Sequence, residues 1–241
     1  MPYLRKIFTM EKALVVEKEP ITLVGGAKFD KKLLKMALDR APQSVGADGG
    51  GSALIADGQI PLAVIGDMDS IDPFMSAKIP ADRFHPVAEQ DSTDFEKCLM
   101  RVEAPALIGV GFLGARVDHQ MAVQTVLVRY PHKRCLLLGE EDLIFVIPPE
   151  FSMALDPDVR VSIFPMAEGK IESEGLFWST SGLTFAPDGQ IGTSNKSTGP
   201  IRLIPDGPKM IAILPVAYFD TVFDALLNAP KWPPSRTQSL A

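Results

Sequence analysis

The chain has 241 residues, of which 46% are hydrophobic and 22% are charged, a composition that is ordinary for a globular protein. Its formal net charge of −6 argues against electrostatic binding to nucleic acid or to an anionic membrane. No apolar run approaches the ~20 residues of a membrane span, and charged residues interrupt the N-terminal segment where a signal peptide would be apolar. Cys98 and Cys135 have no CxxC partner, so we expect buried thiols and a cytoplasmic protein.

The first half of the chain alternates strand-like and helix-like segments. Short apolar runs predict strands at Ile21–Ala27 (with its glycine turn), Ser44–Ala47, Leu62–Ile65, Pro105–Val110 and Arg134–Leu138. Helical spacing predicts helices at Asp30–Arg40, from a cap at Ser92 or Thr93 through Val102, and at Ala115–Arg129. This alternation is typical of a mostly parallel sheet with helices on both faces.

The second half has a different pattern. Helical periodicity disappears until Thr221, and turn dipeptides separate alternating segments at Arg160–Phe164, Leu176–Thr180, Ile201–Ile204 and Lys209–Leu214. The sequence therefore predicts an α/β domain over residues 1–148 and an antiparallel β domain over residues 149–241, either a β-sandwich, which we favour, or a flattened barrel, with a flexible tail from about residue 230.

The segment VIGDMDS places two carboxylates directly after a predicted strand. Asp67 and Asp69 are one residue apart, and carboxylates this close repel each other unless a cation or a proton offsets the cost. Hard oxygen ligands at a strand end suit Mg²⁺, which usually accompanies a phosphate-bearing substrate. For this pair alone, a turn or a helix cap is the more common explanation.

Three further acidic motifs change that balance. Asp48 stands in GADGGGS, Asp94 in EQDSTDFEK and Asp118 in GFLGARVDH. Parallel strands gather the residues that follow them at one edge of the sheet, so we expect Asp67, Asp69 and Asp94 to bind Mg²⁺, with Asp48 and Asp118 near a nucleotide. The glycines after Asp48 allow a phosphate to approach the backbone. Lys97 and Arg116 offer positive charge, although Lys97 fits an intrahelical pair with Asp94 equally well. The residues that we expect near the phosphates are therefore Gly49, Gly50, Gly51, Lys97 and Arg116.

The run Gly109–Gly114 is a competing motif, because GxGxxG between a strand and a helix is the dinucleotide-binding fingerprint. That fingerprint normally belongs to the first strand–helix unit, whereas this run comes near the end of the predicted sheet. The neighbouring carboxylates would also repel a bare pyrophosphate. We therefore interpret these glycines as a nucleotide-binding turn and disfavour a dehydrogenase.

Taken in order, four motifs closely resemble those of the thiamine pyrophosphokinase family. They are ADGGGSAL at residues 47–54, GDMDSI at 66–71, EQDSTDFEK at 89–97 and GFLGARVDH at 111–119. The second half adds SEGLFW at 173–178 and TSN at 193–195, similar to that family's thiamine-binding segments. Met68 and Glu89 depart from the family's frequent residues.

The resemblance implies a homodimer with active sites at the subunit interface, and transfer of pyrophosphate from ATP to thiamine, which gives thiamine diphosphate and AMP. It implies Mg²⁺ on Asp67, Asp69 and Asp94. It implies ATP contacts from Asp48, Gly49, Gly50, Ser70, Lys97, Arg116 and Asp118, and thiamine contacts from Gln90, Trp178, Ser194 and Asn195.

Two alternatives stay open at this level. One is another Mg²⁺-dependent nucleotidyl- or glycosyltransferase with a DxD site, which would release a nucleoside diphosphate or pyrophosphate. The other is a non-catalytic thiamine- or nucleotide-binding regulator, which need not keep three carboxylates. Judged without the resemblance, Trp178 is more often a residue of a sandwich core than a ligand contact.

Overall fold

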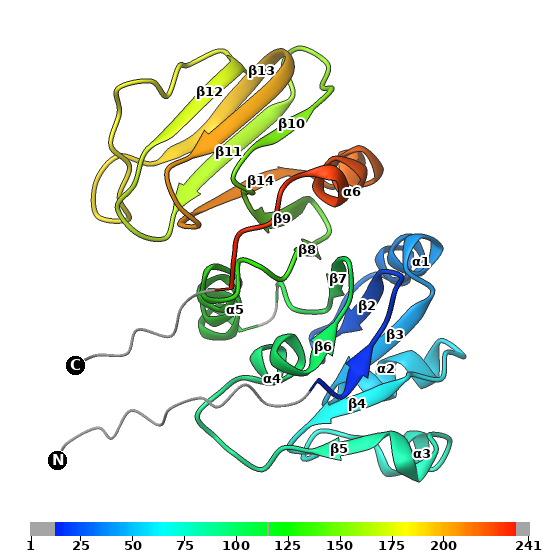
Figure 1. The fold of residues 1–241 in the computed structure, drawn as a ribbon. Helices are drawn as coiled ribbons and strands as arrows, with labels where there is room; N and C mark the ends of the chain where they lie inside the picture. Colours follow the sequence, from blue (N-terminus) through cyan, green and yellow to red (C-terminus); the bar gives the residue numbers. More distant parts are fainter. Residues whose placement is uncertain (1–12, 115, 235–241) are drawn as a thin grey trace, which may run out of the picture.

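The computed structural model describes residues 13–114 and 116–234. Within them, one 12-stranded sheet runs through both halves of the chain, in the order β10-β13-β11-β14-β9-β8-β7-β2-β3-β4-β5, with β12 paired to β13 (Figure 1). A separate pair joins β1 (Val15–Val16) to β6 (Val102–Glu103). The β8–β9 and β9–β14 pairs are antiparallel, so the sheet continues across residue 148 rather than stopping there.

Parallel strands form the first half. They are β2 (Ile21–Val24), β3 (Gln43–Ala47), β4 (Ala63–Gly66), β5 (Phe84–Pro86), β7 (Leu107–Val110) and β8 (Cys135–Leu138). The helices are α1 (Lys31–Arg40), α2 (Gly50–Ala56), α3 (Pro73–Ser76), α4 (Asp94–Arg101) and α5 (Val117–Arg129), with a short 3-10 turn at Ala81–Arg83. The α/β expectation for this half is confirmed.

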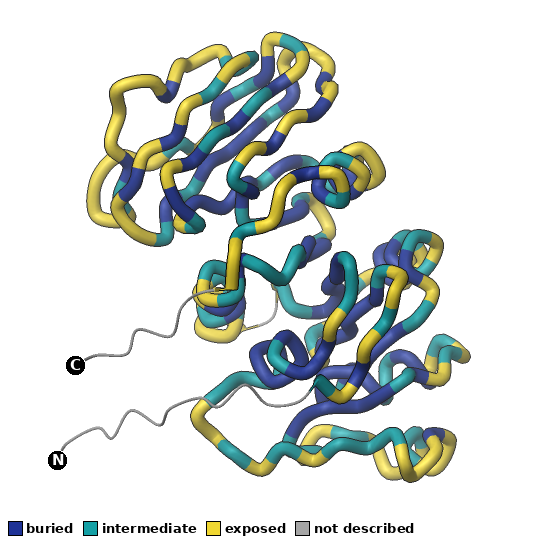
Figure 2. The backbone as a smooth tube through the Cα atoms, in the orientation of Figure 1, coloured by how far each residue is buried: buried dark blue, intermediate teal, exposed yellow. Residues whose placement is uncertain are grey.

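Alternate residues of the parallel strands enter two different cores, because successive side chains of a strand point to opposite faces. Ile108 and Leu136 pack with Leu33 of α1, whereas Leu107 and Leu137 pack with α4 and α5. Helices therefore cover both faces of the sheet, and its strands are the dark, buried part of Figure 2.

The second half is antiparallel. Its strands are β9 (Asp142–Val146), β10 (Phe151–Met153), β11 (Arg160–Pro165), β12 (Ile171–Leu176), β13 (Gly192–Pro205) and β14 (Met210–Pro215). A 3-10 turn at Val216–Tyr218 and helix α6 (Phe219–Asn228) follow. The long strand β13 pairs with β11 at one end and with β10 and β12 at the other. Residues of β10, β11 and β13 share one core, an arrangement that is compatible with the expected sandwich.

One strand prediction is wrong in position. The alternating segment Leu176–Thr180 is not a strand beyond its first residue, since β12 ends at Leu176. The reason is a contact from a distant part of the sequence: the side chain of Asn195 forms hydrogen bonds with both backbone polar groups of Trp178, so these groups do not pair with a neighbouring strand. The helix α2, which begins within the glycines after Asp48, was not predicted either.

The described end of the chain lies against the body. Trp232 donates from its indole Nε1 to the carbonyl oxygen of Ile147 at 2.9 Å. Trp232 falls within the tail that we expected to be flexible from about residue 230, and the rest of that tail, residues 235–241, lies outside the described residues. Among the described helices, none is long and apolar enough to cross a membrane.

Candidate active site

Three carboxylates converge at the carboxyl edge of the parallel sheet. Asp48 follows β3, Asp67 follows β4, and Asp94 opens α4. One oxygen from each lies within 4.8 Å of the others. The neighbouring order β3-β4 brings the first two together, since the ends of adjacent parallel strands lie at one edge. This group is called the carboxylate cluster below.

Asp48 is held in the cluster by an uncommon backbone conformation. Its φ of +47° is in the left-handed region, which Asp tolerates better than most residues. Gly66 makes room for it, because a Cβ at position 66 would stand 2.8 Å from the Cβ of Asp48. Asp48 is buried, and its Oδ1 has no hydrogen-bond partner among the described residues. A buried acceptor without a partner costs free energy unless a ligand satisfies it.

Asp94 stands in the first turn of α4, whose N-cap is Thr93, and Lys97 lies one turn further on. Lys97 is almost fully buried, and its Nζ donates to Asp94 Oδ1 at 3.0 Å. Burial raises the pKa of Asp94, Lys97 opposes that rise, and repulsion from Asp48 and Asp67 adds to it. The cluster therefore disfavours its third negative charge when no cation is bound.

Gln90 lies directly beside this cluster. Its Nε2 donates to Asp67 Oδ2 at 3.2 Å. This hydrogen bond is the largest of the effects that hold the pKa of Asp67 below its ordinary value. The structure therefore brings a residue that the sequence linked to thiamine against one that it linked to Mg²⁺.

Asp69 is placed differently from the other predicted metal ligands. It is exposed and is not one of the three converging carboxylates. Its backbone N–H faces Asp67 Oδ1 at 3.4 Å, and Ser70 Oγ donates to its Oδ1 at 2.7 Å. Asp69 and Ser70 thus lie at the exposed side of the cluster.

The glycines after Asp48 fit against neighbouring backbone. A Cβ on Gly50 would stand 1.8 Å from the carbonyl oxygen of Val24, which no other residue could accept. A Cβ on Gly49 would stand 3.3 Å from the carbonyl oxygen of Ser70. These glycines let the loops after β2, β3 and β4 close together.

Arg116 and Asp118 form an exposed pair at the start of α5. Arg116 donates through Nε to Asp118 Oδ1 (3.1 Å) and through Nη2 to Oδ2 (2.6 Å). The guanidinium lowers the pKa of Asp118 to about 2. Both side chains follow β7, two strands away from β3, at the same edge of the sheet.

The remaining predicted residues gather in the antiparallel half. Asn195 is buried; its Oδ1 accepts from Trp178 N–H (3.1 Å), and its Nδ2 donates to the Trp178 carbonyl (2.7 Å). Ser194, with φ of +61°, donates its N–H to Ser162 Oγ at 3.0 Å. Trp178 itself is 55% exposed, so it is not a core residue.

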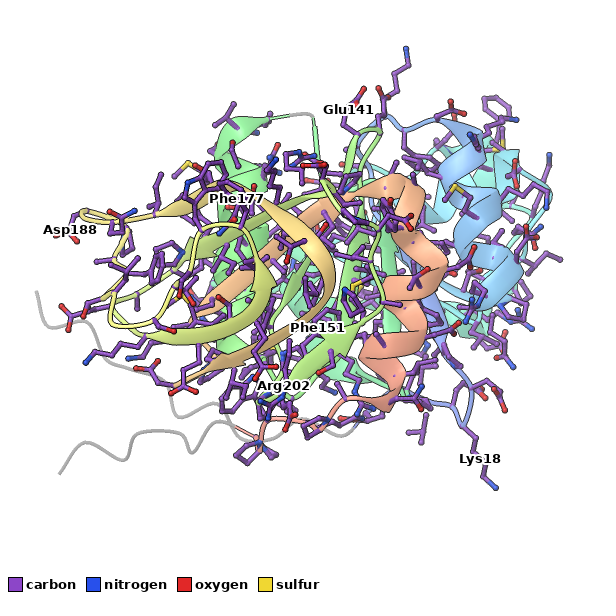
Figure 3. All side chains as sticks on the ribbon, turned by 90° about the horizontal axis from the view of Figure 1, so that it is seen from above. Lys18, Glu141, Phe151, Phe177, Asp188 and Arg202 are labelled. Atoms are coloured by element: carbon purple, nitrogen blue, oxygen red, sulfur yellow. The ribbon has the colours of Figure 1, made fainter. Side chains whose placement is uncertain are left out.

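Phe177 is a member of this group that the sequence reasoning missed. It is exposed, its ring packs edge-on against Trp178 with centroids 4.8 Å apart, and Lys196 Nζ lies 4.8 Å from its centroid. We call Phe177 and Trp178 the aromatic face. Figures 1 and 3 both place it in the antiparallel half, away from β3 and β4. The adjacent aromatic pair in SEGLFW was the available signal.

The carboxylate cluster has the donor set and the charge that a divalent cation needs. Its oxygens are hard ligands at a mutual spacing that one ion can bridge, and Asp48 Oδ1 is buried without a partner. The residues present therefore fit Mg²⁺. From the sequence we predicted that Asp48 lies near the nucleotide. Its position in the cluster makes it a candidate metal ligand as well.

The fold and this site define a mixed α/β protein with a cluster of carboxylates at the sheet edge whose donor set fits a cation. A family model described as the catalytic domain of thiamin pyrophosphokinase matches residues 34–138. Thiamine pyrophosphokinase 1 of Oryza sativa subsp. japonica is 28% identical over 154 residues, covering 56% of this chain and 58% of that protein. Thiamine pyrophosphokinase 3 of the same plant is 28% identical over 195 residues, covering 65% and 72% respectively.

The crystal structure of yeast thiamin pyrophosphokinase superposes with a TM-score of 0.71 at 16% identity, covering 86% of this chain and 89% of that one, which shows a shared fold. These findings confirm the resemblance of the chain to the thiamine pyrophosphokinase family. The matched segment covers 58% of the length of the first plant relative.

Proposed function

We propose that this protein is a thiamine pyrophosphokinase, which transfers the pyrophosphoryl group of ATP to the hydroxyl of thiamine and releases AMP. The observation that carries the proposal is the carboxylate cluster, at a sheet edge whose motifs match the family's in order. The names of the plant relatives support the same activity.

In this proposal Asp48, Asp67 and Asp94 hold Mg²⁺, with Asp69 at the exposed side of the site. The ion supplies charge neutralisation on the phosphate oxygens. Lys97 opposes the rise in the pKa of Asp94 and holds its carboxylate in place through a buried contact of 3.0 Å. The glycines after Asp48 give the phosphates access to the backbone, and Ser70, Arg116 and Asp118 complete the ATP side.

The thiamine hydroxyl must attack the β-phosphorus in line with the departing AMP, so positioning and electrostatics dominate the catalysis. Gln90 orients Asp67 and borders the position of the hydroxyl.

The aromatic face is the proposed thiamine platform. Thiamine carries a cationic thiazolium and a flat pyrimidine, and an indole attracts both through stacking and cation–π interaction, worth about 0.5–2 kcal/mol. Asn195 fixes the backbone of Trp178 through two hydrogen bonds, and Ser194 adds a polar contact. Since β12, the strand before this face, lies away from β3 and β4, the strands that precede Asp48 and Asp67 (Figure 1), we propose a homodimer in which each face completes the partner's site.

Product identification tests the reaction. Purified protein is incubated with thiamine, ATP and Mg²⁺, and the products are separated by chromatography. We expect thiamine diphosphate and AMP in equal amounts, and none without Mg²⁺. Formation of thiamine monophosphate and ADP would contradict pyrophosphoryl transfer, and no turnover with either set of products would favour the non-catalytic alternative.

Subunit exchange tests the shared site. Trp178→Ala and Asp67→Asn homodimers each carry a lesion in both sites. In a mixed dimer, one site collects both lesions and the other is intact, so activity should partly recover after exchange. If tagged subunits exchange and no activity returns, each site is built within one chain.

A further inference from the structure

The loop between β5 and α4 leads from one side of the proposed site to the other. Gln90 donates to Asp67 Oδ2 at 3.2 Å, and Asp94, four residues later, belongs to the carboxylate cluster. Residues 87–93 are neither helix nor strand. Regular secondary structure therefore does not fix the direction of Gln90, and a local contact has to do so.

The carboxylate of Glu89 closes this loop. Its Oε2 accepts hydrogen bonds from two successive backbone N–H groups, those of Asp91 (2.8 Å) and Ser92 (3.0 Å). Its Oε1 accepts from Ser92 Oγ. Hydrogen bonds to an ionised group are stronger than neutral ones, and Glu89 is half-buried, so water competes for its oxygens only in part. We call these three hydrogen bonds the Glu89 clasp.

The clasp sets the direction of Gln90, because Gln90 lies inside the loop that the clasp closes. Gln90 is exposed, so packing does not hold its side chain, and a free glutamine samples many rotamers. The direction in which the backbone presents this side chain decides whether its amide reaches Asp67. The three hydrogen bonds of Glu89 hold that backbone on the carboxyl side of Gln90.

Asp94 is held by contacts of its own. The N-cap Thr93 accepts from Glu96 N–H at 3.3 Å and fixes the start of α4. Lys97 Nζ donates to the Asp94 carboxylate at 3.0 Å. Asp48 is likewise directed by its own backbone conformation. Loss of the clasp should therefore disturb the Gln90 side of the site far more than the metal side.

We propose that Glu89 is a positioning residue, whose carboxylate holds Gln90 against Asp67 and thereby sets the position of the thiamine hydroxyl. The inference rests on the proposed function, because it takes thiamine as the ligand that Gln90 borders. Glu89 is not one of the three converging carboxylates. Its role requires a hydrogen-bond acceptor of the right length at position 89, whereas a further metal ligand would require the negative charge.

Two substitutions at position 89 separate geometry from charge. Glu89→Gln keeps the length of the side chain and one oxygen, which can accept from both backbone N–H groups while the new amide donates to Ser92 Oγ. Glu89→Ala removes every acceptor. The matched control is Glu19→Ala, an exposed glutamate before the amino end of β2, at the opposite edge of the sheet from the cluster. Steady-state kinetics measure kcat/KM for thiamine, calorimetry measures binding of Mg·ATP, and thermal unfolding checks the fold.

We expect Glu89→Ala to lower kcat/KM for thiamine by roughly tenfold or more and to leave Mg·ATP affinity within about threefold. Glu89→Gln should stay within about threefold of the native protein in both quantities, and Glu19→Ala should change neither. Unchanged kcat/KM in Glu89→Ala overturns the proposal. So do equal losses in the two variants, which would make the charge the essential feature, and so does a matching loss of Mg·ATP affinity, which would place Glu89 at the metal.

A double-mutant cycle tests whether the effect passes through Gln90. If it does, Glu89→Ala should change kcat/KM less than about twofold in a Gln90→Ala background, because the side chain that the clasp positions is already absent. A merely structural role gives the same loss in both backgrounds, and that result overturns the proposal. If Glu89→Ala fails to fold, Ser92→Ala, which removes one of the three hydrogen bonds, takes its place in the cycle with a smaller expected loss.

The proposed function fails separately, when native protein forms no thiamine diphosphate. The clasp is then tested by nuclear magnetic resonance of the Gln90 side-chain amide, whose signals are assigned by their absence from the spectrum of Gln90→Ala. These signals should shift in Glu89→Ala and stay in place in Glu89→Gln. Signals that do not move in Glu89→Ala overturn the positioning role whatever the reaction is.

Discussion

The carboxylate cluster and the aromatic face hold their side chains in place in opposite ways. The cluster is sheltered, its three carboxylates come from three segments, and glycine contacts set the backbone around it. The aromatic face is exposed, comes from one segment after β12, and depends on the buried side chain of Asn195.

The difference indicates what would stabilise a ligand at each of the two sites. Like charges this close repel, and Asp48 is also buried, so the cluster holds an unfavourable interaction that a cation would relieve. An exposed aromatic pair has lost little water, and it gains most when a ligand and a second surface cover it together. The first site is assembled within one chain, whereas the second, if it is the proposed thiamine platform, would be completed by the surface that covers it.

Charge removal at the cluster should have the largest effect. Asp67→Asn keeps the shape of the side chain but removes a charge that the metal requires. We expect more than a hundredfold loss of turnover, about 2.7 kcal/mol in the barrier, with the melting temperature kept or raised because repulsion is relieved. Steady-state kinetics and thermal unfolding measure the two.

Asp82→Asn, on the exposed 3-10 turn, is the matched control and should change neither quantity. Asp69→Asn extends the comparison to the exposed side of the cluster, since Asp69 is exposed and lies outside the three converging carboxylates. Near-normal turnover in both Asp67→Asn and Asp69→Asn would place the metal elsewhere.

Removal of the buried amide that holds the aromatic face should cost stability. Asn195→Ala leaves the N–H and carbonyl of Trp178 without their partners. We expect the free energy of unfolding to fall by about 1–3 kcal/mol, the usual cost of broken buried hydrogen bonds. Denaturant titration measures this fall, with the exposed Asn228→Ala as control. Equal, small losses in both variants would contradict the assigned role of Asn195.

Mg²⁺ binding should stabilise the cluster in a pH-dependent way. An ion that binds only the folded protein adds about 1.4 kcal/mol at ten times its dissociation constant. Because burial raises the pKa of Asp94, protons compete with the ion at a higher pH than for an ordinary carboxyl. The rise in melting temperature with Mg²⁺ should therefore be full near neutrality and shrink as pH falls through that raised range.

The same Mg²⁺ titration on Asp67→Asn supplies the control, and the rise in melting temperature should largely vanish. An unchanged rise in that variant would mean that the ion binds outside the cluster.

Truncation of the aromatic face should weaken one substrate only. Trp178→Ala should lower thiamine affinity by about 0.5–2 kcal/mol through lost stacking and cation–π attraction, and leave ATP affinity unchanged. Calorimetry measures both ligands. The chain's other tryptophan, Trp232, supplies the control as Trp232→Phe, since it is bonded to Ile147 on another part of the fold. Equal weakening of both substrates would contradict a separate thiamine face.

The smallest structural effect is expected at the exposed pair on α5. Arg116→Ala should leave the melting temperature unchanged, because surface ion pairs contribute little to stability. It should still raise the KM for ATP if Arg116 contacts phosphate. A change in melting temperature with an unchanged KM would reverse that interpretation.

The sequence by itself determined the strands β2, β3, β4, β7 and β8 and the helices α1, α4 and α5, because each carries a clear period or apolar run, whereas it did not indicate β5, α2 or α3. The sequence also predicted that the acidic motifs meet in space, since residues that follow parallel strands lie at one edge of the sheet. Asp67 and Asp94 converge there as that argument requires.

Only the tertiary structure decided the rest. Asp48 joins the cluster because a left-handed φ and contact with Gly66 set the direction of its side chain. Asp69 lies at the exposed side of the cluster, which the DxD spacing did not indicate. Leu176–Thr180 alternates like a strand, yet Asn195, seventeen residues from Trp178 in the chain, pairs with the Trp178 backbone instead. The continuity of the sheet across residue 148 likewise depends on the pairing of β9 with β14, nearly seventy residues later. Such contacts between distant parts of the chain produce no periodic pattern of residues, so they could not be predicted from the sequence.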